Sequence, residues 1–110
     1  MMGILGKLFS MVSGGASEQL PEQATLIDVR SPAEFAAGHI DGAIPLPLPS
    51  MAQGIDKIAQ DKEAPIIVYC QSGARSAAAR QQLISLGYRQ VVNGGGVFSL
   101  ARRMNRRILS

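Results

Sequence analysis

The sequence has one cysteine, one histidine and no tryptophan among its 110 residues. A single thiol excludes an intrachain disulfide and any zinc site built from several cysteines. One unpaired cysteine also fits a reducing compartment, so we expect a cytoplasmic protein. The sequence lacks any apolar run close to the ~20 residues that a membrane-spanning helix requires.

Charge is also scarce, because charged residues make up 17% of the chain and hydrophobic residues 46%. This composition is globular, and the length fits one domain. The net charge is +3, but four of the eleven basic residues stand close together near the end of the sequence: Arg102, Arg103, Arg106 and Arg107. The remaining seven basic residues face eight acidic ones, so we expect no nucleic-acid partner.

The first residues differ in character from the rest. Met1–Val12 places its apolar residues at helical spacing, which is typical of an amphipathic helix. Such a helix either folds back on its own domain, stays unstructured, or rests on a membrane or partner. Residues 13–17 form a glycine- and serine-rich linker. We therefore assign residues 1–17 to an amphipathic segment with its linker and residues 18–110 to the domain.

The four arginines near the end of the sequence form a second surface feature. In a predicted helix over 97–109, Arg102 stacks with Arg106 and Arg103 with Arg107. Cations at a helix end are favourable in any protein, so a solvated face is one interpretation. The other is an anionic docking surface, and Met1–Val12 together with Arg102–Arg107 then gives a peripheral contact with a membrane or an acidic partner.

The periodicity of apolar residues predicts alternating strands and helices. We expect strands over 25–30, 66–69 and 88–92, helices over 32–37, 50–60, 76–86 and 97–109, and a glycine turn over 93–96. The segment 43–49 contains three alternate prolines, so it lies extended at a sheet edge or in a loop. Alternation of this kind predicts an α/β fold with a mostly parallel sheet covered on both faces.

Our interpretation of function rests on residues 66–80. A buried strand over Ile66–Tyr69 leads into Cys70, a small polar loop follows, and Ser76 is expected to open a helix. This order directs the loop amides toward a helix N-terminus, where anions are stabilised. The helix dipole and the nearby Arg75 both favour the thiolate. The sequence therefore predicts a nucleophilic sulfur facing an anion pocket.

Each of these residues also has a simpler explanation. Cys70 could pack as a small hydrophobe, and Ser72 and Ser76 could serve only as turn and cap residues. A cation at a helix start opposes the dipole, so the placement of Arg75 favours substrate binding over mere solvation. We interpret His39 as structural, and we expect Asp28 and Arg30 to form hydrogen bonds that support the first strand and nearby loops.

Three motifs in this order resemble the rhodanese family. They are Asp28-Val29-Arg30 with Glu34-Phe35 and Gly38–Ala43, then Cys70–Ser76, then Gly95-Gly96, and they span residues 25–100. Two positions depart from the family pattern. Pro45 stands where an asparagine is usual, and Phe98 or Leu100 stands where a tryptophan is usual. Both are expected to be packing positions.

The resemblance implies a rhodanese-like three-layer α/β/α fold with a mostly parallel central sheet. It also implies sulfur transfer without a metal or cofactor: Cys70 takes the outer sulfur of a donor such as thiosulfate and holds it as a persulfide. A thiophilic acceptor (cyanide, a thiol or a partner protein) then removes it. The expected amide cradle and substrate-binding residues are Gln71, Ser72, Gly73, Ala74, Arg75 and Ser76, with Arg75 on the oxyanion end of the donor.

Two other functions remain open. A cysteine phosphatase or arsenate reductase uses the same thiolate and arginine, but it generally has five residues between them. Here four residues separate Cys70 from Arg75, and Tyr69 precedes the cysteine where many phosphatases have histidine. A rhodanese-fold module that only docks partners is the third hypothesis, and loss of the cysteine would favour it.

Overall fold

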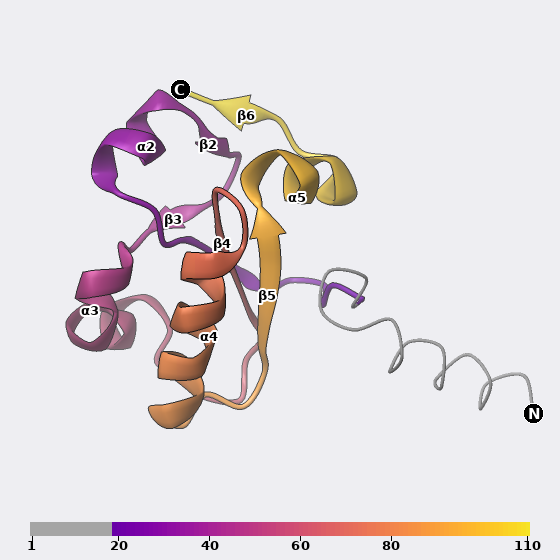
Figure 1. Ribbon diagram of the computed structural model, residues 1–110. Helices are drawn as coiled ribbons and strands as arrows, with labels where there is room; N and C mark the ends of the chain where they lie inside the picture. The colour runs from indigo at the N-terminus through magenta and orange to yellow at the C-terminus, as the bar shows by residue number, and fades with distance from the viewer. Residues whose placement is uncertain (1–18) are drawn as a thin grey trace, which may run out of the picture.

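The computed structural model describes residues 19–110 (Figure 1). In chain order the elements are β1 (Thr25–Asp28), α2 (Pro32–Ala37), β2 (His39–Ile40), β3 (Ile44–Pro45), the 3-10 helix η2 (Leu48–Ser50), α3 (Met51–Ile58), β4 (Ile66–Cys70), α4 (Ala74–Ser85), β5 (Val91–Gly96), α5 (Val97–Met104) and β6 (Ile108–Leu109). The predicted N-terminal segment and linker, and the boundary at residue 18, lie outside the described residues.

The main sheet has four parallel strands in the order β3-β1-β4-β5. All five residues of β4 are buried, as the continuous apolar run predicts for a strand covered on both faces. The proline-rich segment supplies the edge strand β3, as expected from the missing N–H of Pro45. A separate antiparallel pair joins β2 to β6, with His39 opposite Leu109 and Ile40 opposite Ile108.

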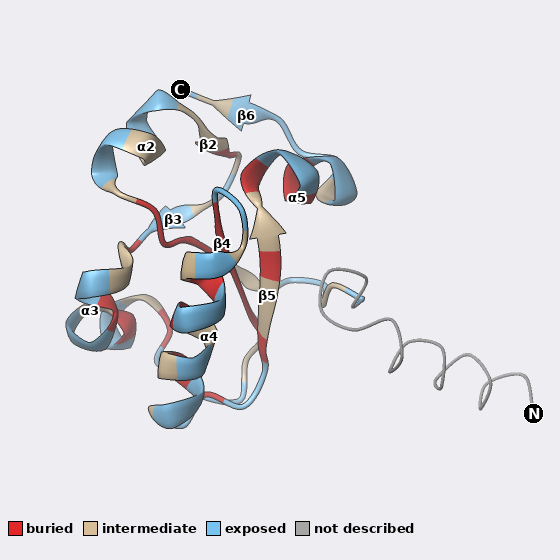
Figure 2. Cartoon of the chain, in the orientation of Figure 1, coloured by how far each residue is buried: buried red, intermediate tan, exposed pale blue. Residues whose placement is uncertain are grey.

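Helices cover both faces of the sheet, so the predicted three-layer α/β/α architecture is confirmed. Alternate residues of a strand point to opposite faces, and β1 and β4 divide their apolar side chains accordingly. Ile27, Ile66 and Val68 pack with α3 and α4. Leu26, Ile67 and Tyr69 pack with α5 on the other face. In Figure 2 the buried residues lie along the strands and on the sides of the helices that face them.

The helix after the cysteine begins earlier than predicted. We expected Ser76 to open it, but α4 starts at Ala74 and Gly73 takes the N-cap position with φ of 101°. That left-handed conformation is available to glycine without strain, so the chain can turn sharply into the helix. Ser76 is therefore a buried residue inside the first turn. Gly87 ends the helix region with φ of 100°, as predicted.

The glycine-rich stretch 93–96 is strand and not the predicted turn. β5 begins at Val91 and continues to Gly96, and the predicted strand start at Tyr88 is too early. Val68 pairs with Asn93 while Tyr69 pairs with Gly95, so Gly94 is an extra residue on β5. This bulge bends the strand just before it reaches the cysteine-bearing loop.

The last helix is shorter than predicted, because α5 ends at Met104 and Asn105 adopts the left-handed conformation. Asparagine is one of the few non-glycine residues that tolerate it. Ile108, expected to face the core, lies in β6 and is 38% exposed. Arg106 and Arg107 lie beyond the helix, so the predicted stacking on Arg102 and Arg103 is wrong.

The contacts of this terminal segment are with the turn after β2. Arg106 Nη1 donates to Asp41 O at 3.2 Å, and Arg107 lies 3.9 Å from the Asp41 carboxylate. Membrane or partner contact through this segment and Met1–Val12 stays a prediction. Over residues 19–110 no helix combines the length and apolarity required to cross a bilayer.

Candidate functional site

Cys70 occupies the carboxyl end of the central strand β4, between β1 and β5. Ligand sites of parallel sheets form at this edge, beyond the ends of the strands. The residue is only 1% exposed, but the next two residues, Gln71 and Ser72, are exposed. The thiol thus lies directly beneath a surface loop. We refer to Cys70–Ser76 as the catalytic loop, after the role that the sequence predicts for it.

The backbone of this loop turns its N–H groups toward the sulfur. Gly73 N donates to Cys70 Sγ at 3.0 Å, and Ser76 Oγ lies 3.5 Å from the same atom. Burial raises the pKa of the Cys70 thiol, but the Ser76 hydroxyl and the amides of Ser76, Ser72 and Gly73 outweigh it and lower the pKa below its ordinary value. The loop therefore forms an inward-facing cradle that favours the thiolate.

Asn93 of β5 supports this cradle, and sequence reasoning missed it. Ser76 Oγ lies 2.7 Å from Asn93 Oδ1, which shares the single hydroxyl proton of Ser76 with Cys70 Sγ, and Asn93 Nδ2 donates to Gly73 O at 3.2 Å. Gly95 N donates to the same Oδ1 at 3.0 Å. One amide side chain thus ties the start of α4 to the bulged end of β5. The polar residue that opens the glycine run is the available signal, although the run itself predicts a turn.

Gly96 brings β5 into direct contact with the catalytic loop. A β-carbon at this position would lie 2.6 Å from the carbonyl oxygen of Gln71, far inside contact distance. At Gly73, a β-carbon would lie 3.6 Å from Gly95 Cα. The late glycines of the sequence therefore allow two backbones to approach, and this is their structural role at the site.

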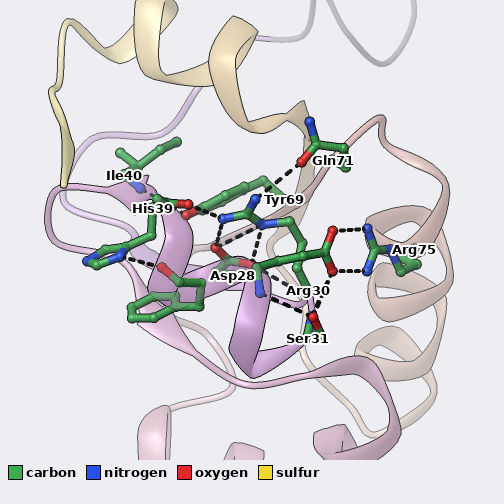
Figure 3. A network of polar contacts seen from close by, with 11 residues as sticks. Asp28, Arg30, Ser31, His39, Ile40, Tyr69, Gln71 and Arg75 are labelled. Atoms are coloured by element: carbon green, nitrogen blue, oxygen red, sulfur yellow. Dashed lines mark hydrogen bonds and ion pairs between the residues drawn. The ribbon is translucent and has the colours of Figure 1, made fainter. Parts of the chain in front are cut away.

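A buried ion pair holds the amino-terminal part of the loop (Figure 3). Asp28 and Arg30 are 0% and 4% exposed, and Arg30 Nη2 donates to Asp28 Oδ2 at 2.7 Å. Other donors of the guanidinium are also used: Nε reaches Asp28 Oδ1 at 3.0 Å, Nη2 reaches Gly38 O at 2.5 Å and Nη1 reaches Gln71 Oε1 at 3.2 Å. The predicted supporting role of the pair thus extends to the catalytic loop itself.

The other end of the loop is joined to α2. Arg75 donates two parallel hydrogen bonds to the Glu34 carboxylate, at 2.7 and 2.9 Å. Glu34 is also the third residue of a capping box, in which it accepts from Ser31 N at 3.1 Å and donates its own N–H to Ser31 Oγ at 3.2 Å. The Arg75 guanidinium, followed by Ser31, lowers the pKa of Glu34 to about 2.

Glu34 is the second residue that sequence reasoning left outside the site. Its place in the capping box was recognisable, but its contact with Arg75 joins positions 41 apart. Ala74 begins α4, and Gln71, Ser72, Gly73, Arg75 and Ser76 have the contacts described above. His39 Nδ1 lies 2.9 Å from Phe35 O and its ring stacks on Phe35 at 3.8 Å, consistent with the predicted structural role.

We compared the residues that depart from the family pattern with their expected role as packing positions. Leu100 is fully buried under the sheet, so it is a packing position, whereas Phe98 is 61% exposed and is not. Pro45 is exposed in β3 at the sheet edge, so the expectation that it is a packing position is wrong. Within residues 19–110, no three potential metal ligands cluster together. A cavity of about 590 Å³ near Val91 and Val92 lies at the amino end of β5, opposite the edge that carries Cys70.

Known proteins resemble this chain in both sequence and architecture. Residues 15–99 match the rhodanese-like domain family model. A sulfurtransferase of Allochromatium vinosum is 39% identical over 82 residues, covering 74% of this chain and 75% of its own. The thiosulfate sulfurtransferase PspE of Escherichia coli is 37% identical over 75 residues, covering 68% and 72%.

Among solved structures, a rhodanese with anions from E. coli has a TM-score of 0.67 at 36% identity and covers 69% of this chain and 89% of that one. A thiosulfate sulfurtransferase from Pseudomonas aeruginosa has a TM-score of 0.70 at 31% identity, covering 78% of this chain and 16% of that one. With the family model matched over most of the domain and the cysteine at the expected strand end, the chain belongs to the rhodanese-like domain family, whose members among these relatives are sulfurtransferases.

Proposed function

We propose that this protein is a thiosulfate-type sulfurtransferase that works through a persulfide on Cys70. The single observation that carries the proposal is the inward-facing cradle, in which Gly73 N lies 3.0 Å from Cys70 Sγ and the Ser76 hydroxyl 3.5 Å from it. Preorganised donors stabilise a negative charge that develops on sulfur, with no metal or cofactor needed. The relatives named thiosulfate sulfurtransferase support the choice of reaction.

The first half-reaction transfers the outer sulfur of the donor. The Cys70 thiolate attacks that sulfur, a new S–S bond forms, and the old S–S bond of thiosulfate breaks to release sulfite. The negative charge moves from the cysteine sulfur to the terminal sulfur of the persulfide. In this step the amides of Ser72, Gly73 and Ser76, which lower the pKa of the thiol, also stabilise the persulfide anion.

The second half-reaction returns the enzyme to its starting state. A thiophilic acceptor attacks the terminal sulfur, the persulfide bond breaks, and the thiolate is regenerated. With cyanide the product is thiocyanate; a thiol or a partner protein takes the sulfur in the cell. Gln71 and Arg75 are proposed to contact the donor, Arg75 through its planar fork on the oxyanion end.

Intact mass measurement tests this proposal most directly. Protein treated with thiosulfate and separated from it should carry one added sulfur, and Cys70→Ser should carry none. The purified wild type should also form thiocyanate from thiosulfate and cyanide. Hydrolysis of an aryl phosphate by protein that never gains sulfur would instead support the phosphatase class, and absence of both reactions would support a docking module.

A further inference from the structure

Both arginines that contact or belong to the catalytic loop are already bound to carboxylates (Figure 3). The Arg30–Asp28 pair is buried, with side chains 5% and 0% exposed, so its charge is fixed within the protein. The Arg75–Glu34 pair is half-exposed, at 40% and 34%. A sulfur-donating substrate that approaches the site therefore meets backbone N–H groups that can bind it. The positive charge of the Arg75 guanidinium, in contrast, is already balanced by the Glu34 carboxylate.

Arg75 lies in the first turn of α4, at the end of the loop that begins with Cys70. A negative charge on Cys70 raises the pKa of Arg75, although less than the direct hydrogen bonds that Arg75 donates to Glu34 do. Thiosulfate carries two negative charges, whereas an alkyl persulfide carries one. Neutralisation of Arg75 by Glu34 therefore weakens the binding of thiosulfate more than that of the alkyl persulfide, because Coulomb energy scales with the charge of the ligand.

We propose that Glu34 is a specificity-determining residue, which occupies Arg75 and shifts the preference of the site from doubly charged donors toward singly charged persulfides. This inference rests on the proposed sulfur transfer through Cys70. Thiosulfate binds when it displaces the Glu34 carboxylate from the guanidinium. Exposed ion pairs open easily, so the effect is a change of preference and not an exclusion.

The capping box makes glutamine the sharpest substitution at this position. Glu34 Oε1 accepts hydrogen bonds from Ser31 N at 3.1 Å and Ser31 Oγ at 3.0 Å, and a glutamine carbonyl oxygen can accept the same two bonds. Glutamine is also a natural third residue of a capping box. Glu34→Gln thus removes the charge, weakens the hold on Arg75 and keeps the start of α2.

Two variants of the Glu34–Arg75 pair distinguish a role in donor preference from a role that only holds the loop in shape. Glu34→Gln releases a cation toward the donor, whereas Arg75→Gln leaves an uncompensated carboxylate there. If the pair only held the loop in shape, both changes would impair both donors in the same way. If Glu34 sets charge preference, the two variants shift the ratio of thiosulfate to persulfide rates in opposite directions.

The experiment uses the full chain and measures the rate of sulfur loading on Cys70 by intact mass, with thiosulfate and with a simple alkyl persulfide as donors. In the second case the Cys70 thiolate attacks the terminal sulfur of the persulfide, a new S–S bond forms on Cys70, the S–S bond of the donor breaks, and an alkyl thiolate leaves. We expect Glu34→Gln to raise the thiosulfate-to-persulfide ratio of second-order rate constants about two- to fivefold, the range of a half-exposed ion pair. Arg75→Gln should lower that ratio. Rising salt should reduce both effects.

Glu63→Gln is the matched control, because Glu63 forms an exposed pair with Arg89 at 3.7 Å and precedes the amino end of β4, away from Cys70. It should leave the ratio unchanged. Equal changes for the two donors, or a shift in the same direction for both variants, would overturn the inference while leaving sulfur transfer intact. Absence of loading from either donor in every protein, wild type included, would overturn the proposed function itself and this inference with it.

Discussion

Replacing Gly96 by alanine should damage the catalytic loop from a neighbouring strand. The new β-carbon would lie 2.6 Å from Gln71 O and 3.7 Å from Ser72 Cα. Ordinary contact begins at 3.4 Å, so the two backbones must separate by the difference, about 0.8 Å. Both contacts are with main-chain atoms, so no flexible side chain can absorb the clash and the catalytic loop has to move.

The expected magnitudes follow from that displacement. Overpacking in a well-packed region costs roughly 1–3 kcal/mol, and we expect a loss of that size in the free energy of unfolding. A catalytic group misplaced by about 1 Å can lose roughly 100-fold in rate, so kcat/KM for thiocyanate formation should fall at least about tenfold. The φ of Gly96 is −87°, so the substitution adds no backbone strain of its own.

Gly95→Ala is the matched comparison. Gly95 has φ of +86°, but a β-carbon there meets nothing within 4 Å. The left-handed conformation costs a non-glycine residue roughly 1–2 kcal/mol, which lowers the melting temperature by several degrees in a domain of this size. The two alanine variants should therefore lose similar stability, while only Gly96→Ala loses most of its activity.

Circular dichroism melting curves and thiocyanate assays well below both melting temperatures separate the two effects. Wild-type kcat/KM in a folded Gly96→Ala protein would show that the loop tolerates the clash, and the steric reasoning would be wrong. An equal loss of activity in Gly95→Ala would likewise refute it, because the damage would then follow backbone strain and not contact with Gln71.

Two further predictions concern the buried ion pair and the thiol. Asp28→Asn leaves Arg30, 4% exposed, without its counter-charge, so urea titration should show a loss of about 3 kcal/mol in unfolding free energy; a loss below about 1 kcal/mol would contradict the assignment. Alkylation of Cys70 should persist to lower pH than alkylation of a free cysteine, because its pKa is lowered, and Ser76→Ala should move the profile to higher pH; an unchanged profile would exclude the hydroxyl as a stabiliser of the thiolate.

The sequence predicted those parts of the fold whose cause is local. The buried strand over Ile66–Tyr69 follows from its apolar run, and α2 follows from Ser31, Pro32 and Gly38 at its two ends. The position of Cys70 at the start of an amide-rich loop followed from the order of apolar strand, small polar loop and helix. Each of these signals lies within a few residues of the structure that it specifies.

Contacts between distant segments were beyond the reach of the same reasoning. Glu34 meets Arg75, and Arg30 meets Gln71, each across 41 positions, and no local pattern pairs them. Asn93 was placed in a turn because glycines follow it, whereas the bulge at Gly94 keeps the segment in the sheet. Ile108 fits the helical period and so predicts a last helix that runs to residue 109, but Asn105 ends it.

The long-range contacts that hold the catalytic loop have a consequence for the chain before it has folded. The groups that hold Cys70–Ser76 come from Arg30 just after β1 and from Glu34 in α2, many residues earlier, and from β5, about twenty residues later. Such long-range contacts form late, after the intervening chain has closed into loops. A nascent or partly folded chain should thus carry an ordinary, unactivated thiol. We therefore expect the Cys70 thiol to become reactive only once the strands and helices around this loop have assembled.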